Sequence, residues 1–247
     1  MSDSVVEPSL YPSQVNPAAA QSTLVLLFKR PLAGQGKQRL AASFGREPTR
    51  RLAETFLHCA IEDLTAWPGR VVLAPAQASD RLWAKQLLNR ADVVPQGEGN
   101  LGQRIIDLDR QLRSLGHQQL VYIGSDAPAL TPSHYRSVAN HLTQTDVVLS
   151  AADDGGVTIM ASREPWPERL IELPWSTEQL GEALASCCQQ QGLGVSYMEP
   201  SYDIDFEQDL ARLVDDLADD TRPARQQLSM LLKALMPADC YANRASN

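Results

Sequence analysis

Four short stretches of this 247-residue chain contain charged side chains, in three of them together with glycine or proline, and each comes after an apolar run. They are GQGKQRL (34–40), SDAP (125–128), DDGG (153–156) and DIDF (203–206). The apolar runs are typical of strands buried on both faces of a parallel sheet. In open parallel sheets, ligands bind outside the carboxyl ends of the strands, so we expect the four stretches to meet there. One stretch is basic and three are acidic, which makes them chemically complementary.

The basic stretch could bind phosphate. Gly34 and Gly36 allow the backbone to approach a ligand closely, and Lys37 and Arg39 would surround a phosphate group with hydrogen-bond donors. The spacing matches neither the P-loop pattern G-x-x-x-x-G-K-[ST] nor the dinucleotide pattern G-x-G-x-x-G. An ordinary flexible basic turn is the alternative, and this stretch alone does not decide between the two.

The SDAP stretch places a carboxylate where the chain leaves a strand. Pro128 has a fixed φ angle and favours an extended conformation for Ala127, which would hold Asp126 at the strand end. A carboxylate in such a position suits a hard cation, Mg²⁺ or Mn²⁺, that prefers oxygen ligands. The alternative is that Asp126 caps the following helix, but Thr131 is better placed for that cap.

The other two acidic stretches also have two interpretations each. Asp-Gly is a hairpin signal, so DDGG is either a tight turn or a pair of carboxylates that binds or positions an acceptor. In an extended DIDF segment, Asp203 and Asp205 would face the same side, where one of them could complete a metal site with Asp126. Alternatively, Asp205 caps the helix that starts at Phe206.

The composition argues against several classes of function. The net charge is −8 and the basic residues are scattered, which argues against binding of nucleic acid or anionic membranes. The four cysteines form no C-x-x-C pair, so we expect reduced thiols that pack as small hydrophobic side chains. The N-terminal residues lack a signal-peptide pattern, and no apolar run reaches the roughly 20 residues of a membrane span. We therefore expect a cytoplasmic protein.

The elements that would position the four stretches alternate between apolar runs and amphipathic segments. We expect strands at 23–29, 70–75, 92–96, 119–126, 146–152, 156–162 and 194–198, and helices at 49–67, 79–89, 101–115, from 132, at 177–191 and from 206. This alternation predicts a mostly parallel sheet with helices on both faces. We expect a single domain at 23–240, a flexible leader at 1–22, a tail at 241–247 and a surface loop on the substrate side at 164–175.

Six stretches, taken together, resemble one family. They are GQGKQRL, QGEGNLGQR, IGSDAPAL, DDGGVTI, LPWST and DIDFEQDL, in this order between residues 24 and 210. They are similar to motifs of the bacterial DUF2064 group, which is part of the GT-A, or nucleotide-diphospho-sugar transferase, superfamily. That superfamily also includes sugar-nucleotide pyrophosphorylases, phospholactate guanylyltransferase and the molybdenum-cofactor guanylyltransferase. The resemblance implies a three-layer α/β/α GT-A fold with a mostly parallel central sheet.

The resemblance also implies a ligand and a metal. A nucleotide or nucleotide-sugar donor would bind at the carboxyl edge of the sheet, with its diphosphate bridged by Mg²⁺ or Mn²⁺. Asp126 would hold this ion, and Asp203 and Asp205 are further candidate ligands. The catalytic residues would be Asp126, Lys37 and Asp154, the last of which would orient or deprotonate the acceptor. The residues expected to contact the substrates are Arg30, Gly34, Gly36, Lys37, Arg39, Gln96, Gly97, Gly102, Arg104, Ser125, Gly155, Gly156, Trp175 and Ser176.

The expected function is a metal-dependent, glycosyltransferase-like enzyme with a nucleotide or nucleotide-sugar donor and a small-molecule acceptor. One alternative is a nucleotidyltransferase, similar to the guanylyltransferases, that moves a nucleoside monophosphate from a triphosphate to a phosphorylated small molecule. A non-catalytic nucleotide-binding paralogue is the second alternative, because Gln38 replaces the threonine of K-T-R-L and Val157 replaces the aromatic residue after D-G-G. Phe206, in place of the threonine of D-I-D-T, is a third departure from the family motifs.

Overall fold

The computed structural model describes residues 16–236. Helix α1 (Pro17–Gln21) precedes the first strand, β1 (Ser22–Phe28). Asn16 caps this helix by accepting a hydrogen bond from the backbone N–H of Ala18, and a proline occupies its first turn. Residues 16–22, which we assigned to a leader, are therefore part of the fold. The other predicted leader positions, 1–15, and the tail at 241–247 lie outside the described residues.

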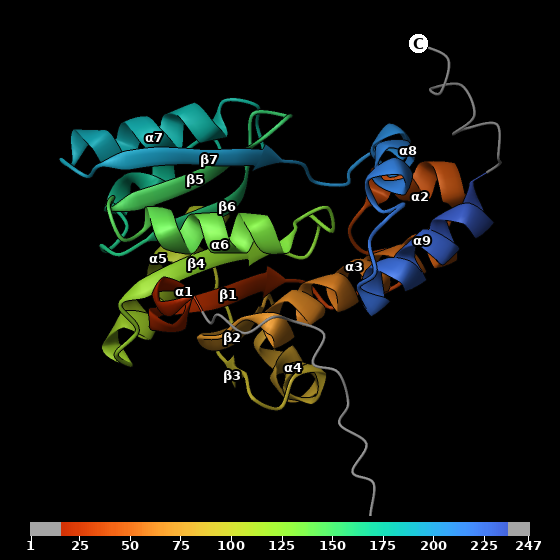
Figure 1. The fold of residues 1–247 in the computed structure, drawn as a ribbon, viewed down its shortest axis with the longest axis horizontal. Coiled ribbons are helices and arrows are strands. Elements are labelled where there is room, and N and C mark those ends of the chain that lie inside the picture. The colour runs from red at the N-terminus through yellow and green to blue at the C-terminus, as the bar shows by residue number, and fades with distance from the viewer. Residues whose placement is uncertain (1–15, 237–247) are drawn as a thin grey trace, which may run out of the picture.

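Within residues 16–236, the strands form one mixed sheet in the order β3-β2-β1-β4-β6-β5-β7 (Figure 1). The strands after β1 are β2 (Arg70–Pro75), β3 (Asp92–Val93), β4 (Gln119–Gly124), β5 (Val147–Ala152), β6 (Val157–Ser162) and β7 (Val195–Ser201). Strand β6 is antiparallel to both of its neighbours, and the other pairs are parallel. The described strands other than β6 therefore all end at one edge, the carboxyl edge. The predicted mostly parallel sheet is confirmed.

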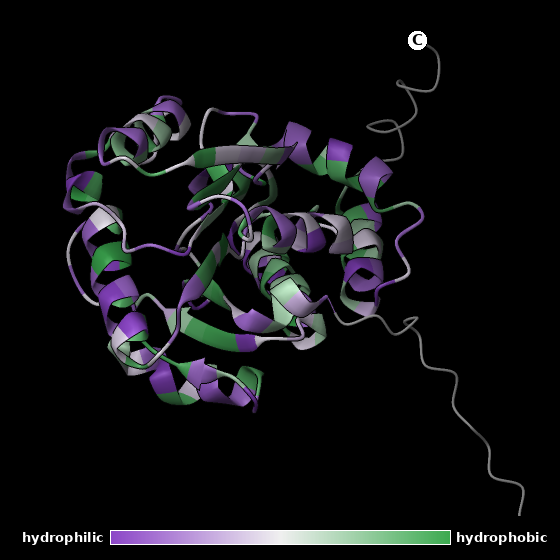
Figure 2. Cartoon of the chain, turned by 60° about the vertical axis from the view of Figure 1, so that its left-hand side comes forward, coloured by the Kyte–Doolittle hydropathy of each residue, from purple (hydrophilic) through white to green (hydrophobic). Residues whose placement is uncertain are grey.

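The strands are apolar along their length because helices cover both faces of the sheet. In β1, Leu24, Leu26 and Phe28 pack into one core cluster, whereas Val25 packs into the cluster on the other face. Figure 2 shows hydrophobic segments along the central strands and many hydrophilic segments on the helices around them. Burial of both strand faces thus explains the continuous apolar runs of the sequence.

Two helical layers enclose the sheet. Helices α1, α3 (Arg46–Ala66), α4 (Arg81–Leu87) and α6 (Pro132–His141) contribute to the core on one face. Helices α5 (Leu101–Ser114) and α7 (Leu180–Gln190) contribute to the core on the other face. The three-layer α/β/α fold class is therefore confirmed. No helix among the described residues is long and apolar enough to cross a membrane.

A third core cluster lies beyond the carboxyl edge of the sheet (Figure 1). Helices α2 (Gln38–Phe44), α8 (Glu207–Asp216) and α9 (Pro223–Leu235) pack together there against the first half of α3. Leu40, Phe56, Leu213 and Leu228 are fully buried in this cluster. The carboxyl ends of the strands therefore face a group of helices.

The segment 164–175, predicted as a surface loop, contributes to the core. Its short 3-10 helix η2 (Glu168–Glu172) packs on α5, and the side chains of Trp166 and Leu170 are buried. Gly102, in the first turn of α5, permits this contact, because a Cβ atom there would lie 2.2 Å from the carbonyl oxygen of Leu170. The prediction of a surface excursion is therefore wrong for Trp166 and Leu170.

Candidate functional site

The basic loop between β1 and α2 has an unusual backbone. Gly34, Gly36 and Lys37 all have positive φ angles, of 79°, 68° and 44°. A lysine in this left-handed conformation costs about 1–3 kcal/mol, so its surroundings must hold it there. The side-chain amide of Gln38 donates hydrogen bonds to the carbonyl oxygens of Gly34 and Gly36, at 3.0 and 3.3 Å. The residue that replaces the family threonine thus stabilises the loop.

The Lys37 ammonium joins three parts of the carboxyl edge. Its Nζ atom lies 2.9 Å from Oδ2 of Asp126, 2.9 Å from Oδ1 of Asp205 and 2.6 Å from the carbonyl oxygen of Ile204. The Lys37 side chain is only 9% exposed, whereas the side chains of Asp126 and Asp205 are 45% and 44% exposed. Burial lowers the pKa of Lys37, but the two carboxylates outweigh that effect and the pKa is raised.

A second basic side chain extends this group toward solvent. Arg39 lies 3.4 Å from Oδ2 of Asp205, and its guanidinium carbon is 4.6 Å from the centre of the Phe206 ring. Phe206, the third departure from the family motifs, therefore supports Arg39 through a cation–π contact. Arg39 is the more exposed of the two basic residues, at 62%.

Asp203 brings a further carboxylate into the same neighbourhood. The pKa of Asp203 is raised to about 7, first by burial and next by the charge of Asp126, while Lys37 opposes the rise. The carboxylates of Asp154 and Asp205 add to it. Four carboxylates therefore act on a region that holds two basic side chains. We call Lys37, Arg39, Asp126, Asp203 and Asp205 the open cluster.

Neither candidate metal ligand at a helix start acts as the cap. In α8, the Asp209 carboxylate accepts hydrogen bonds from the backbone N–H groups of Asp205 and Phe206, at 2.9 and 2.7 Å. Before α6, Thr131 occupies the cap position, and its backbone N–H donates to Nδ1 of His134. The capping alternatives for Asp126 and Asp205 are therefore wrong, and both carboxylates pair with Lys37 instead.

The SDAP turn is held on both sides. The carbonyl oxygen of Asp126 accepts a 2.9 Å hydrogen bond from the backbone N–H of Ile204, which ties the turn to the DIDF segment. Ser125 donates to Oδ1 of Asp126 at 3.3 Å. Behind the turn, the buried Arg225 donates to the carbonyl oxygen of Pro128 at 3.3 Å. These contacts fix the direction in which the Asp126 carboxylate leaves the strand.

The DDGG stretch forms the tight turn between β5 and β6. The backbone N–H groups of Ala152 and Gly155 donate across it, and Oδ1 of Asp154 accepts a 3.0 Å hydrogen bond from the N–H of Gly156. Gly155 has a φ angle of 82°, and a Cβ atom there would lie 1.9 Å from the carbonyl oxygen of Glu178. The hairpin interpretation is thus correct for the backbone. Asp154 still acts electrostatically on the open cluster.

Helix α8 clamps this turn. Arg212 forms an ion pair with Asp153, and its guanidinium carbon lies 3.8 Å from the centre of the Tyr202 ring. The Tyr202 hydroxyl in turn donates to Asp216. Neither Arg212 nor the Ile204 carbonyl was expected at the site from the sequence. No local pattern marks Arg212, because it lies 59 residues from Asp153.

Several residues predicted to bind substrate instead contact other parts of the protein. Arg30 lies 3.5 Å from Asp80 and stacks on Trp83, at the α4 side of the sheet. Gln96 is buried and donates to the carbonyl oxygens of Phe28 and Ala74. The structure therefore gives Arg30 and Gln96 contacts away from Lys37 and Asp126.

The remaining predicted residues shape the loops around the site. Arg104 donates to the carbonyl oxygen of Gly99 at 2.9 Å, and Gly97 has a φ angle of 80°. Trp175 donates to the carbonyl oxygen of Leu170 at 2.7 Å, and the neighbouring Ser176 is left-handed, with a φ angle of 64°. These contacts join Arg104, in the first turn of α5, to Gly99 and join Trp175 to η2.

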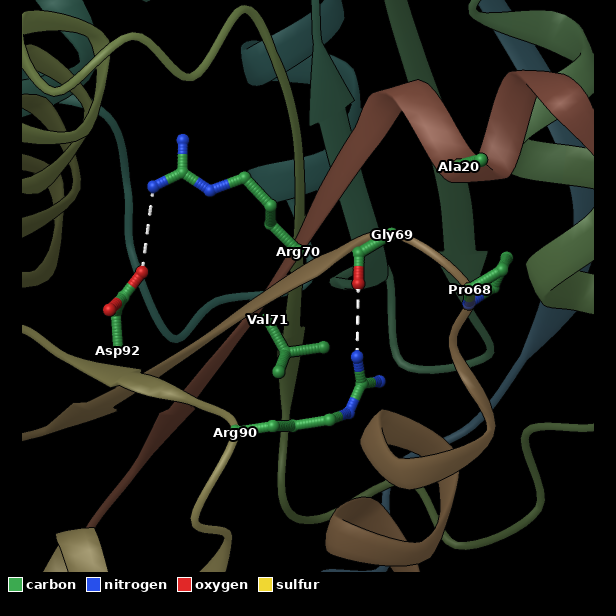
Figure 3. A pocket seen from close by; sticks show the side chains of 7 residues that line it. All are labelled: Ala20, Pro68, Gly69, Arg70, Val71, Arg90 and Asp92. Atoms are coloured by element: carbon green, nitrogen blue, oxygen red, sulfur yellow. Dashed lines mark hydrogen bonds and ion pairs between the residues drawn. The ribbon is translucent and has the colours of Figure 1, made fainter.

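A pocket at the opposite, amino edge of the sheet is separate from this group (Figure 3). Its volume is about 400 Å³, and it is lined by Ala20, Pro68, Gly69, Arg70, Val71, Arg90 and Asp92. Arg70 lies 3.5 Å from Asp92, and Arg90 donates to the carbonyl oxygen of Gly69 at 3.2 Å. This pocket is not lined by any residue of the GQGKQRL, SDAP, DDGG or DIDF stretches.

The open cluster fits a metal ion that arrives with a phosphate. Among residues 16–236, no group of three or more histidine, cysteine, aspartate or glutamate side chains could hold a metal by itself. Mg²⁺, however, is commonly bound by one or two carboxylates together with substrate phosphates. A half-exposed Asp126 beside a raised-pKa Asp203 supplies that ligand chemistry.

Part of the chain matches a known protein family. Residues 58–177, just under half of the chain, match the family described as "Uncharacterized protein conserved in bacteria (DUF2064)". This segment belongs to the DUF2064 family. It contains the QGEGNLGQR, IGSDAPAL, DDGGVTI and LPWST stretches, so the resemblance seen in the sequence is confirmed. No curated protein matched the chain.

Solved structures of transferases share the fold of this chain. A candidate nucleotide-diphospho-sugar transferase from Desulfovibrio desulfuricans G20 has a TM-score of 0.78 and 18% identity, covering 87% of this chain and 98% of that one. A nucleotidyl transferase from Methanothermobacter thermautotroptrophicus has a TM-score of 0.52 and 18% identity, covering 78% and 96%. A cytidylyltransferase from Leptospira borgpetersenii serovar Hardjo-bovis has a TM-score of 0.52 and 12% identity, covering 87% and 94%. Likeness at these identities shows the fold.

Proposed function

We propose that this protein is a metal-dependent transferase that uses a nucleotide or nucleotide-sugar donor and a small-molecule acceptor. The observation that carries the proposal is the convergence of Lys37, Asp126 and Asp205 at the carboxyl edge of the sheet. Ligands of open α/β sheets bind at this edge. The fold, which the chain shares with nucleotide-diphospho-sugar transferases and nucleotidyltransferases, supports the same class of donor.

Each part of the open cluster has a role in this reaction. Lys37 and Arg39 would donate hydrogen bonds to the phosphate oxygens of the donor. Asp126, with Asp203 or Asp205, would hold Mg²⁺ or Mn²⁺, which neutralises charge on the departing diphosphate when it is bound. Positioning of the donor and neutralisation of its charge would supply most of the rate.

We favour glycosyl transfer as the reaction. The acceptor oxygen would form a bond to the anomeric carbon while the bond from that carbon to the donor phosphate breaks, and the acceptor proton would pass to Asp154. The nucleotidyl alternative uses the same cluster. There, an acceptor phosphate oxygen would attack the α-phosphate and pyrophosphate would leave.

A non-catalytic nucleotide-binding protein is the alternative from another class. Its support came from Gln38 and Val157, two of the departures from the family motifs. Gln38 stabilises the basic loop, and Val157 packs against the core of the α5 and α7 layer. Both residues therefore have structural reasons for their identity, which weakens the case for lost activity.

A ligand panel tests the proposal. Thermal unfolding of the full chain would be followed with nucleoside diphosphates, triphosphates and nucleotide-sugars, each with and without Mg²⁺ or Mn²⁺. We expect metal-dependent stabilisation by at least one donor, because a ligand that binds only the folded state raises its stability. Asp126→Asn should lose this stabilisation, whereas Asp92→Asn, the same change at the amino edge, should keep it. Absence of metal-dependent stabilisation by every donor would contradict the proposal.

Turnover separates the alternatives. Release of a nucleoside diphosphate from a nucleotide-sugar indicates glycosyl transfer, and release of pyrophosphate from a nucleoside triphosphate indicates nucleotidyl transfer. Binding without either product, over a broad panel of acceptors, would favour the non-catalytic alternative.

A further inference from the structure

Lys37 itself occupies the position of a cation between two carboxylates. Its Nζ atom is equally far, 2.9 Å, from one oxygen of Asp126 and one oxygen of Asp205. Asp126 follows β4 and Asp205 follows β7, and these strands are separated in the sheet by β6 and β5. The ammonium thus links two distant strand ends whose like charges would otherwise repel each other.

Three oxygen atoms surround the Lys37 ammonium in this arrangement. Its Nζ atom donates hydrogen bonds to Oδ1 of Asp205 and to the carbonyl oxygen of Ile204, and it forms an ion pair with Oδ2 of Asp126 at 2.9 Å. A phosphate that binds the ammonium would therefore compete with these three oxygen atoms. A divalent ion at Oδ2 of Asp126 would likewise compete with the ammonium for the same oxygen.

The two carboxylates that contact Lys37 differ in their other partners, so only Asp126 would lose its basic partner if the ammonium moved. Arg39 also contacts Asp205, at 3.4 Å, so that carboxylate keeps a basic partner when Lys37 moves. The only basic partner of Asp126 among the described salt bridges is Lys37. The backbone of Lys37 is fixed in the left-handed conformation before α2, whereas its four-carbon side chain can turn without moving the loop.

We infer that the Lys37 ammonium acts as an exchangeable internal cation, which occupies the metal position in the ligand-free site and thereby excludes divalent metal. The ammonium leaves Asp126 only when a phosphate group of the donor binds it. Metal and donor phosphate then bind together, and neither binds tightly alone. This inference rests on the proposed function. It adds that metal binding depends on phosphate binding, because the phosphate frees the metal ligand Asp126. It makes the free metal ion and the metal-free donor poor ligands of the resting protein.

Binding of Mn²⁺ to the full chain, followed by the electron paramagnetic resonance signal of the free ion, tests this inference. The wild type should bind Mn²⁺ alone weakly. Lys37→Met should bind Mn²⁺ alone at least about tenfold more tightly, which corresponds to ~1.4 kcal/mol. Arg46→Met removes a positive charge from the start of α3, beside Gly34, and serves as the matched control. It should behave as the wild type does, because Arg46 is not part of the open cluster.

A second measurement on the wild type does not depend on any substitution. Mn²⁺ binding is measured at saturating concentrations of UDP, GDP, CDP or ADP. At least one of these nucleotides should strengthen it about tenfold or more. Mn²⁺ should tighten the binding of that nucleotide by the same factor, because coupling between two ligands is reciprocal. In Lys37→Met this coupling should be weaker, because Asp126 is free to bind the metal without the phosphate.

The outcomes for the inference and for the proposed function can be told apart. Equal or weaker Mn²⁺ binding by Lys37→Met, relative to the wild type, overturns the inference and leaves the function standing if a nucleotide still binds with metal. If no nucleotide binds with metal to the wild type, the proposed function fails. Tight Mn²⁺ binding by the unliganded wild type, equal to that with nucleotide, also overturns the inference.

Discussion

Two clusters, each of acidic and basic residues, lie on either side of the SDAP turn, and they differ in burial. In the open cluster, half-exposed carboxylates share two basic residues. The second, which we call the buried cluster, consists of Glu62, Asp63, Tyr135, Arg222 and Arg225. Asp63 accepts hydrogen bonds from Arg222 and Arg225 at 2.9 and 2.6 Å, and from the Tyr135 hydroxyl at 2.9 Å. Arg225 is fully buried.

The difference in burial agrees with a structural role for the buried cluster and with the proposed binding role of the open cluster. The buried cluster pairs Arg222 and Arg225 with Glu62 and Asp63, and Arg222 also pairs with Asp220. The remaining donors reach the carbonyl oxygens of Cys59, Pro128 and Leu130. The arginine donors are therefore bound to groups within the fold, two of which are carbonyl oxygens at the SDAP turn and just after it. The open cluster leaves the Asp126 carboxylate half exposed, as the proposed binding of a metal ion requires. The same residue types thus anchor the turn on one side and offer a ligand on the other.

The largest effect on stability should come from the buried cluster. Asp63→Ala leaves Arg222 and Arg225 buried without this carboxylate, so we expect the free energy of unfolding to fall by about 3–5 kcal/mol. Urea unfolding measures this change. Asp107→Ala, which removes an exposed carboxylate paired with Arg110, should change stability by less than about 1 kcal/mol. A similar small loss for Asp63→Ala would mean that the two clusters do not differ in role.

The open cluster should show the reverse pattern. Asp126→Asn should change the free energy of unfolding by less than about 1 kcal/mol, because the carboxylate is half exposed. The same variant should bind a donor with metal about 100-fold more weakly, equivalent to ~2.7 kcal/mol. Urea unfolding and a nucleotide titration with Mn²⁺ measure the two quantities on one preparation. A large stability loss with unchanged nucleotide binding would reverse the assignment of the clusters.

The clamp between α8 and the DDGG turn should have an intermediate effect. Arg212→Met removes the ion pair with Asp153 and the stacking on Tyr202, so we expect a stability loss of about 1 kcal/mol. Because Asp153 adjoins Asp154, the KM for the acceptor should rise more than kcat falls. Arg169→Met, at an exposed i,i+3 pair, should change neither. An unchanged KM for Arg212→Met would assign the clamp to stability alone.

The smallest effect concerns a buried group that lacks a counter-ion. His117 is buried, its Nδ1 contacts the Thr23 hydroxyl at 2.7 Å, and its Nε2 has no hydrogen-bond partner. Burial and, next, the charge of Arg70 lower the pKa of His117. Its contribution to stability is therefore complete above the unfolded pKa of about 6.5 and declines as the pH falls below that value.

The His117→Gln variant should consequently lose less stability than the wild type between pH 7.5 and pH 5. Urea unfolding at both pH values measures the difference. A steeper pH dependence in the variant would show that His117 is stabilised in its charged form, as a member of an ion-pair cluster would be.

Local patterns in the sequence were sufficient to predict the layers of the fold and the residues of the open cluster. Apolar runs marked the strands, and charged residues directly after them marked the carboxyl edge. The N-terminal helix was missed although its signal is present, since Asn16 is followed by Pro17 and alanines. Trp166 and Leu170 were assigned to the surface because nearby prolines and charges outweighed their apolar side chains.

Pairings across the fold could not be predicted in this way. Asp63 and Arg222 are 159 residues apart, and Lys37 and Asp205 are 168 apart. Each side chain carries no local sign of its partner, so Gln96 could equally have faced a ligand or the strand carbonyls that it contacts. Only the order of the strands and the packing of helices such as α3 and α9 bring such residues together.

Crystals grown with Mn²⁺ and the nucleoside diphosphate that binds most tightly provide the most direct test of the central claim. The anomalous signal of manganese locates the ion without reference to any assumed ligand. We predict a manganese peak about 2.1 Å from a carboxylate oxygen of Asp126, with the Lys37 ammonium moved from that oxygen to a phosphate. A manganese ion bound elsewhere, with Lys37 still between Asp126 and Asp205, would contradict the account.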